Sequence, residues 1–225
     1  MTDLVAIDGP VGVGKSSVAR RLAQRLGWRH LDTGAMYRAV AWLALRGGAD
    51  VQDAAACAAL AASMRLEFIP HAEGQRLLLN GEDATEAIRS HAVTEAVSSV
   101  ADLIEVRTEL VRRQQALGAG GQAVAEGRDM GTVVFPTARW KFYLEAEARE
   151  RARRRGGQLS REGHPLSEAE LIASLAERDR RDRQRPVGAL RVAPEAIVIE
   201  TTRMTEDRVV EIIEQLVRAD LEGTG

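Results

Sequence analysis

The sequence predicts an α/β fold: a five-stranded parallel sheet flanked by helices, an inserted subdomain with a small antiparallel hairpin, and a mobile lid. Two observations support this fold. Short apolar runs alternate with segments of helical periodicity, which is the order that builds a parallel sheet covered on both faces. One pair of neighbouring runs within residues 65–83 instead has the pattern of an antiparallel hairpin. We expect residues 1–225 to form one large domain that contains the insertion.

The elements follow one another in a regular order. Helices are expected at residues 18–26, 35–46, 53–64, 86–99, 102–117 and 205–221. The sheet strands are expected at residues 4–8, 28–32, 122–126, 140–144 and 196–200, each a short apolar run beside an acid or a turn. Ligands of such sheets bind at the carboxyl ends of the strands. The acids and glycines that follow the first three strands are therefore expected to converge on one crevice.

Composition excludes several classes of partner. Lys and Arg number 31 against 33 Asp and Glu, a net charge of −2, so nothing favours binding to nucleic acid or to a membrane surface. No apolar run approaches the ~20 residues of a membrane span, and the amino terminus has no signal-peptide pattern. The single cysteine, Cys57, is expected to be a buried helix residue. We expect a cytoplasmic monomer, since no large exposed apolar patch is apparent.

The strongest motif is Gly9-Pro-Val-Gly-Val-Gly-Lys-Ser16, which fits G-x-x-x-x-G-K-[ST] between a strand and a helix. Its glycines allow consecutive N–H groups to turn inward around a phosphate at a helix amino terminus. Lys15 would reach the β- and γ-phosphates of ATP, and the Ser16 hydroxyl would bind Mg²⁺. The predicted core is therefore that of a P-loop NTPase. The chain's only asparagine, Asn80, precedes a glycine, so the Asn-Lys-x-Asp element that guanine-nucleotide switches share is missing.

A second motif follows the second predicted strand. Asp32-Thr-Gly-Ala-Met-Tyr-Arg38 offers Thr33 as a helix cap, and Tyr37 and Arg38 lie about one turn into the helix. Arg38 can bind a phosphate with two hydrogen bonds, or it can form an ordinary surface ion pair.

Two later segments are rich in charge. Glu126-Gly-Arg-Asp129 follows the third strand, where Arg128 and Asp129 could hold a phosphate and a sugar hydroxyl. Residues 177–185 place Arg178, Asp182 and Arg185 on one helix face. That face is either solvated, with pairs such as Arg178 and Asp182, or it points into a site where arginines neutralise a transferring phosphoryl group. A lid at residues 148–170 would bring them in, with residues 156–165 having the composition of a hinge loop.

Together these stretches resemble bacterial cytidylate kinases, within the nucleoside monophosphate kinases. The resemblance runs along nearly the whole chain, through Ile-Asp-Gly-Pro-x-Gly-x-Gly-Lys-Ser at 7–16, Leu-Asp-Thr-Gly-Ala-Met-Tyr-Arg at 31–38, Gly-Arg-Asp-Met-Gly-Thr-Val-Val-Phe-Pro at 127–136 and Glu-Arg-Asp-x-x-Asp-x-x-Arg at 177–185. It implies transfer of the γ-phosphoryl group of ATP, with Mg²⁺, to CMP and dCMP, and it makes residues 65–100 an inserted CMP-binding subdomain.

The resemblance also implies roles for individual residues. Ser98 and Arg107 would read the cytosine base, the hydroxyl at the amino group and the guanidinium at the carbonyl edge. ATP would be held by Gly9, Pro10, Val11, Gly12, Val13, Gly14, Lys15, Ser16 and Ser17, with Ser16 on the metal. The acceptor nucleotide would be held by Thr33, Tyr37, Arg38, Ser98, Arg107, Arg128, Asp129, Arg178, Asp182 and Arg185. The residues expected to act in the transfer itself are Lys15, Arg128, Asp129, Arg178 and Arg185.

Departures from the family pattern lie beside the expected site. The chain has Gly188-Ala-Leu190 and Pro194-Glu-Ala196 where the family has Ser-Pro-Leu or Ala-Pro-Leu and Asp-Ala, and Glu200-Thr201 where Asp-Ser or Asp-Thr is usual. Adenine packing and lid closure are therefore open. Two rival functions remain at this point: another small-molecule P-loop kinase, acting on a different monophosphate or on shikimate, and a catalytically silent nucleotide sensor. The carboxylate that supports the metal is also open among Asp8, Asp32, Glu126 and Asp129.

Overall fold

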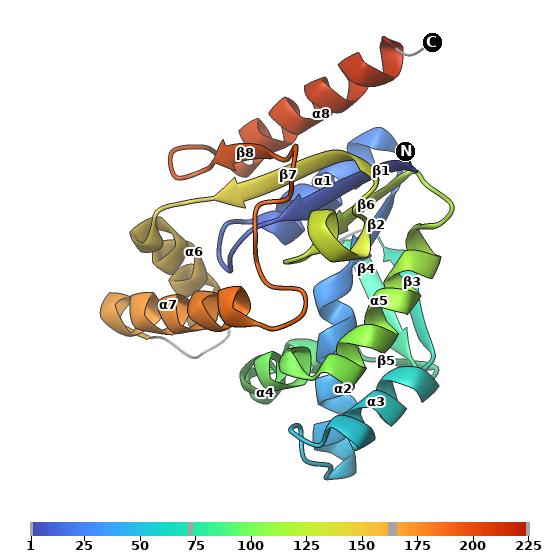
Figure 1. Ribbon diagram of the computed structural model, residues 1–225. Coiled ribbons are helices and arrows are strands. Elements are labelled where there is room, and N and C mark those ends of the chain that lie inside the picture. Colours follow the sequence, from blue (N-terminus) through green and yellow to red (C-terminus); the bar gives the residue numbers. More distant parts are fainter. Residues whose placement is uncertain (1, 72–73, 162–165, 224–225) are drawn as a thin grey trace. The chain divides into compact units, whose positions relative to one another are not determined.

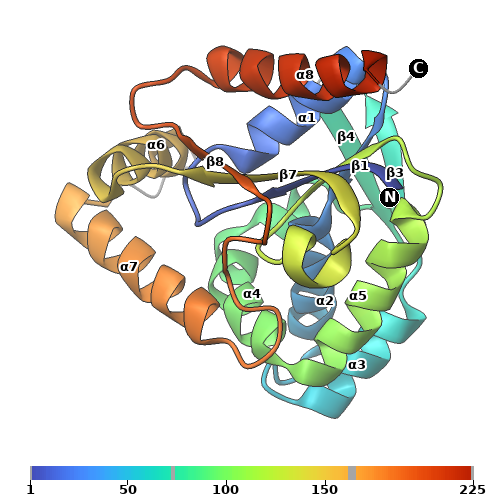
Figure 2. The same ribbon diagram turned by 45° about the horizontal axis from the view of Figure 1, so that its top comes forward.

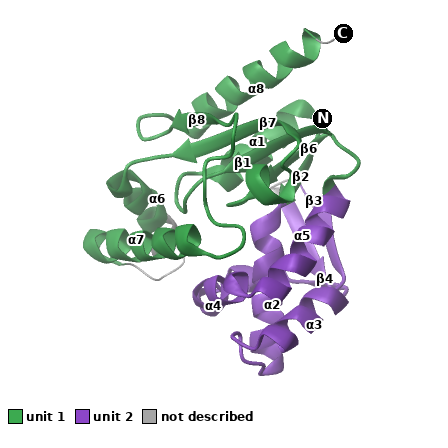
Figure 3. Cartoon of the chain, viewed as in Figure 1, with its two compact units in different colours: residues 1–31, 118–225 green, residues 32–117 purple. Residues whose placement is uncertain are grey.

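The computed structural model describes residues 2–71, 74–161 and 166–223. The chain divides into two compact units, residues 1–31 with 118–225 and residues 32–117, which are coloured separately in Figure 3. Each unit has its own hydrophobic core.

The first unit is built on the predicted five-stranded sheet (Figure 1). Strand β1 lies at its centre and pairs in parallel with β6 and β7, and β7 pairs in parallel with β8. Five consecutive residues at the end of β1 are buried, as expected for a parallel strand covered on both faces. The strand order is β2 (Arg29–Asp32), β6 (Ala123–Glu126), β1 (Thr2–Asp8), β7 (Ala138–Glu145) and β8 (Ile197–Glu200).

Helices α1 (Lys15–Leu26) and α8 (Glu206–Glu222) lie beside each other along this sheet in both views (Figures 1 and 2). Their buried side chains join those of the strands in one core. Helices α6 (Ala148–Arg161) and α7 (Glu168–Gln184) form a pair held by Leu159, Leu171 and Leu175. A short π-helical turn, η2 (Met130–Val134), follows β6, and such turns are frequent at functional sites.

The second unit combines helices with a small sheet. Its antiparallel strands β3 (Leu66–His71), β4 (Gly74–Leu79) and β5 (Glu82–Asp83) pair in sequence order, which confirms the predicted hairpin; its tip at 72–73 lies outside the described residues. Cys57 is buried in a helix, as predicted. The helical elements are α2 (Thr33–Gly47), α3 (Ala54–Ser63), the 3₁₀ turn η1 (Ala87–Arg89), α4 (His91–Asp102) and α5 (Ile104–Gly118).

Two local predictions were wrong. The helix expected at residues 86–99 is interrupted at Ser90, whose extended backbone ends η1 and begins α4. The loop expected at residues 156–165 is helical as far as Arg161, and residues 162–165 lie outside the described part of the chain. Gly156 is in that helix, where a Cβ atom would be 3.0 Å from the Cδ1 of Leu171. The glycine therefore allows α7 to approach α6 closely at this position.

Within the described residues, no helix combines the length and the apolar character needed to cross a bilayer.

Candidate active site

The loop after β1 has the backbone of a phosphate cradle. Gly9 has a φ of 147°, and a Cβ atom there would lie 2.2 Å from the carbonyl oxygen of Leu144, so only glycine fits at this position. Gly12 and Gly14 also have left-handed backbones, and Gly14 begins α1 without a side-chain cap. The first N–H groups of α1 therefore point into the loop without a side-chain acceptor, which is the arrangement that binds anions.

Lys15 is the first residue of α1 and is only 5 % exposed. Its Nζ atom donates a hydrogen bond to the Pro10 carbonyl at 2.6 Å, across the loop. Burial, and then the positive charge of Arg128, lower the pKa of Lys15 well below its ordinary value, while Glu126 and Asp182 act in the opposite direction. An incoming phosphate would add negative charge here and favour the charged ammonium.

Asp8, the last residue of β1, holds the start of η2. Its two carboxylate oxygens accept hydrogen bonds from the N–H groups of Met130 and Gly131, both at 2.8 Å. Burial raises the pKa of Asp8 to about 6; the two backbone hydrogen bonds and Lys15 counteract this rise, and Asp129 adds to it. From the sequence, Asp8 was one of four acids expected near the phosphates and the metal. Its contacts with residues 122 and 123 positions away have no local sequence signal.

Three of the predicted residues meet at one carboxylate. Asp182, on α7, is 4 % exposed; its Oδ2 accepts from Arg128 Nε and its Oδ1 from Arg185 Nη2, both at 2.8 Å. Burial alone would raise the pKa of Asp182, but the charges of Arg128, Arg185 and Arg178 and the hydrogen bond from Arg128 outweigh it and lower that pKa. The solvated-face alternative for residues 177–185 is therefore wrong at Asp182.

This cluster lies close to the phosphate cradle. Arg128, Asp182 and Asp8 all contribute to the electrostatic environment of Lys15, so the structure brings the ends of β1 and β6 together with α7. Asp129 is buried and begins η2. Glu126 is also buried, with His30 Nε2 4.0 Å from its Oε1. Two arginines of α6, Arg151 and Arg154, also contact the loop, and neither was predicted as a site residue from the sequence.

The remaining predicted residues lie in the second unit. The predicted cap of α2 was wrong: Asp32 is the cap, since its Oδ1 accepts from the N–H of Ala35 at 2.9 Å, and Thr33 is the first helical residue. Asp32 also pairs with Arg89 at 3.3 Å. Aspartate is at least as good a helix cap as threonine, so the preceding residue takes that role and Thr33 is buried within the first turn.

Arg38 and Arg107 are held by different contacts. Nη1 of Arg38 donates to the Thr94 hydroxyl at 2.9 Å and to the Ile88 carbonyl at 3.4 Å. Arg107 is 2 % exposed; its guanidinium carbon lies 5.4 Å from the centre of the Tyr37 ring, and its Nη1 donates to the carbonyl of Ala101 at 3.2 Å. A planar guanidinium fixed in this way presents its donors in one orientation.

Ser98 is half-buried on α4, one turn after Thr94. Residues four apart share a helix face, so α4 carries Ser98 on the face that also bonds Arg38. The second unit thus contains Thr33, Tyr37, Arg38, Ser98 and Arg107, and the first unit contains the other predicted site residues.

The described residues contain no group of three or more His, Cys, Asp or Glu side chains placed to hold an ion. Mg²⁺ needs few protein ligands when substrate phosphates and water complete its octahedron. Ser16, exposed in the first turn of α1, fits that requirement as an oxygen donor beside the phosphate cradle.

Comparison with known proteins identifies the family of the chain. The sequence profile described as cytidylate kinase matches residues 5–219. A cytidylate kinase of Geobacillus kaustophilus (strain HTA426) is 46 % identical over 213 residues, covering 95 % of each chain. A bifunctional pantoate ligase/cytidylate kinase of Synechococcus sp. (strain JA-3-3Ab) is 49 % identical over 225 residues; that match spans 99 % of this chain but only 42 % of the relative.

Solved structures agree in fold. A shikimate kinase from Acinetobacter baumannii in complex with shikimate superimposes with a TM-score of 0.50 at 17 % identity, covering 98 % of this chain and 95 % of that one. An uncharacterized protein from Eubacterium ventriosum reaches a TM-score of 0.56 at 11 % identity, covering 97 % and 99 %. Identities this low show a shared fold and nothing more. The family is shown by the sequence profile and by the closer relatives: the chain belongs to the cytidylate kinase family.

Proposed function

We propose that the chain transfers the γ-phosphoryl group of ATP to CMP and dCMP, giving ADP with CDP or dCDP. The observation that carries the proposal is the cluster of Lys15, Arg128, Asp182 and Arg185 beside the Gly9–Ser17 loop, in a chain of the cytidylate kinase family. The cluster gathers three cations where a transferring phosphoryl group develops negative charge.

The loop binds the donor. Inward N–H groups of the loop and of the first turn of α1 hold the β- and γ-phosphates, and Lys15 leaves the Pro10 carbonyl to contact them. Ser16 provides a hydroxyl oxygen for Mg²⁺, which when bound neutralises charge on the phosphates. Arg128 and Arg185, held by one carboxylate, keep their guanidinium groups oriented before the reaction begins.

Residues of the second unit bind the acceptor in this proposal. Arg38 takes the CMP phosphate, with Thr33 and Tyr37 beside it, and Ser98 with Arg107 reads the cytosine. The buried, ring-stacked guanidinium of Arg107 supports that role, since a base edge is best recognised by donors that do not move.

The transfer itself needs no general base. An oxygen of the CMP phosphate is already anionic near neutral pH and attacks the γ-phosphorus in line. The bond from the γ-phosphorus to the β–γ bridging oxygen breaks, and ADP leaves with that electron pair. Asp129 remains a proposed partner of the sugar or of the metal environment, and Arg178 of the sugar and phosphate. We further propose residues 65–100 as the CMP-binding subdomain, residues 148–170 as the lid, and a cytoplasmic monomer.

Lys15→Met tests the proposal most simply. The substitution keeps an unbranched side chain of nearly the same length and removes the charge, so CMP-dependent ADP release should collapse by two orders of magnitude or more, on the scale of about 1.4 kcal/mol per tenfold loss in rate. Arg21→Met is the matched control, because it removes an exposed cation from the same helix. A Lys15→Met variant that releases ADP at a near-normal rate contradicts the assignment.

A further inference from the structure

A loop that turns its N–H groups inward must turn carbonyl oxygens outward, and these need donors when they are covered by protein. Two arginines of α6 supply them. Arg151 Nη1 donates to the Val11 carbonyl at 3.1 Å, and Arg154 Nη1 donates to the Val13 carbonyl at 3.3 Å. Contact between loop and helix is close: a Cβ atom on Gly12 would lie 3.2 Å from both the Cβ and the carbonyl oxygen of Arg151.

Asp179 of α7 fixes the first of these arginines. Its Oδ2 accepts from Arg151 Nη1 at 2.6 Å, and the two side chains are only 4 % and 9 % exposed. The same Nη1 atom thus bonds both the loop carbonyl and the carboxylate. Asp179 stands between Arg178 and the Asp182 cluster in the motif of residues 177–185, and the proposed reaction gives it no role.

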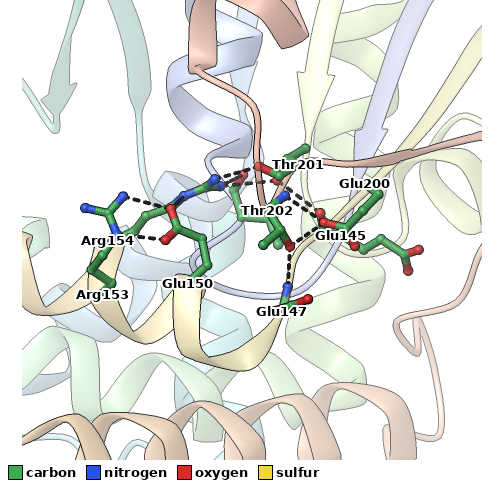
Figure 4. Close-up of polar contacts among 9 residues, drawn as sticks. Glu145, Glu147, Glu150, Arg153, Arg154, Glu200, Thr201 and Thr202 are labelled. Carbon is green, nitrogen blue, oxygen red and sulfur yellow. Dashed lines mark hydrogen bonds and ion pairs between the residues drawn. The ribbon is translucent and has the colours of Figure 1, made fainter.

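Arg154 is fixed by a second network, shown in Figure 4. Its Nε donates to Glu150 Oε1 at 2.8 Å, its Nη2 to the Thr201 carbonyl at 2.7 Å and its Nη1 to the Thr201 hydroxyl at 3.2 Å. Thr201, the residue after β8, is itself bonded through its N–H to the Glu145 carbonyl at the end of β7. The guanidinium is therefore anchored on the sheet before it reaches the loop.

The Arg151–Asp179 pair is a costly way to gain stability. Among the described residues, Arg151 Nε and Asp179 Oδ1 are buried without a hydrogen-bond partner, and a buried polar atom without a partner keeps its desolvation penalty. Buried ion pairs are commonly no more stabilising than apolar side chains of the same volume. A role in setting the geometry of the loop accounts for the pair better than a role in overall stability.

We propose that Arg151, Arg154 and Asp179 are positioning residues for ATP: they hold the Val11 and Val13 carbonyls outward so that the loop's N–H groups face the phosphates. The inference rests on the proposed function. It also moves the start of the proposed lid. The first two turns of α6 contact the phosphate-binding loop, so a closing motion would involve only residues after Arg154.

Asp179→Asn is the direct test, since it keeps the shape of the side chain and removes its charge. Small displacements of a binding group cost large factors, so the Kd of ATP should rise about tenfold to a hundredfold. The Kd of CMP should stay within about twofold of the wild-type value. The midpoint of thermal unfolding should fall further than in the control, because the substitution removes one partner of a buried ion pair. Asp207→Asn is that control: it makes the same substitution in an exposed pair with Arg21, joining α8 to α1. Calorimetric titration gives both Kd values, and thermal unfolding without nucleotide gives the stability of each variant.

Arg154→Met keeps the inference testable if Asp179→Asn does not fold, because the Arg154 side chain is 23 % exposed and its loss buries no unpaired carboxylate at that site. It should weaken ATP and spare CMP in the same way. Equal weakening of both nucleotides, or no change in either, overturns the inference while leaving the proposed function intact. A wild-type chain that binds neither nucleotide overturns the proposed function itself.

Discussion

Asp182→Asn is the substitution that probes the arginine cluster most sharply. The carboxylate uses its two oxygens separately, one for Arg128 and one for Arg185. An asparagine amide has one acceptor oxygen and one NH2 group, which can only donate, so whichever way it turns, an N–H of the amide faces an N–H of one arginine. The variant also leaves Arg128, Arg178 and Arg185 without the negative charge that holds them together.

The expected magnitude follows from these contacts. A hydrogen bond to a charged group contributes about 1.5–3 kcal/mol, and removing one partner of a buried pair costs about 3–5 kcal/mol. We therefore expect the free energy of unfolding to fall by about 3 kcal/mol. If half or more of that energy is needed to orient the two arginines for phosphoryl transfer, kcat falls by about tenfold to a hundredfold.

Urea unfolding and steady-state ADP release measure the two effects, with Asp207→Asn as the control. Because the pKa of Asp182 is lowered in the folded chain, its contribution is present above the ordinary aspartate pKa and is lost as pH falls through the lowered value. The stability difference between wild type and Asp182→Asn should therefore shrink at acid pH. A variant within about 0.5 kcal/mol of wild type and with kcat unchanged would refute the reasoning, because surface substitutions already vary by that much.

Three further outcomes are expected. Gly9→Ala should abolish detectable ATP binding, because its Cβ would lie 2.2 Å from the Leu144 carbonyl oxygen; an alanine variant that binds ATP normally in a titration contradicts the cradle geometry. Arg107→Met should raise the KM of CMP while sparing that of ATP, and equal changes in both would remove Arg107 from cytosine recognition. The pKa of Asp8 is raised to about 6, so kcat/KM should decline as pH drops through 6, because the protonated carboxyl can no longer accept from both N–H groups of η2. The free energy of unfolding should change in the opposite direction: the folded chain holds this proton more tightly than the unfolded chain, so the contribution of Asp8 to stability falls as pH rises from about 4 to 6. A kcat/KM that stays flat between pH 5 and 7 would show that the ionised form is not required.

Much of the fold was predictable because its strands and helices correspond to local patterns of apolar and polar residues. All five sheet strands and the hairpin lie where the apolar runs are, and the family prediction is confirmed by the sequence profile and the relatives. Two errors came from contacts that local patterns do not show: which of two adjacent residues caps α2, and which side chains pack along α6. Asp32 takes the cap that Thr33 could have provided, and the packing of Leu159 on α7 keeps residues 156–161 helical despite two glycines.

The supporting contacts of the site could not be predicted in this way. Arg151 meets Asp179 across 28 residues and the Val11 carbonyl across 140, and an arginine-rich segment gives no sign of which guanidinium turns inward. Asp8 looked like one acid among four at strand ends; only the fold shows that it accepts from two backbone N–H groups. The residues proposed to touch substrate came from motifs and from the family resemblance, whereas the residues that hold those motifs in place required the three-dimensional structure.

The most direct test of the account is ADP release with Mg·ATP and, in parallel, CMP, dCMP, UMP, AMP, GMP or shikimate. The account predicts a strong preference for CMP and dCMP over every other acceptor. Preference for another acceptor would keep the phosphate cradle and discard the roles given to Ser98 and Arg107, and silence across the whole panel would contradict the proposed kinase and favour a nucleotide sensor.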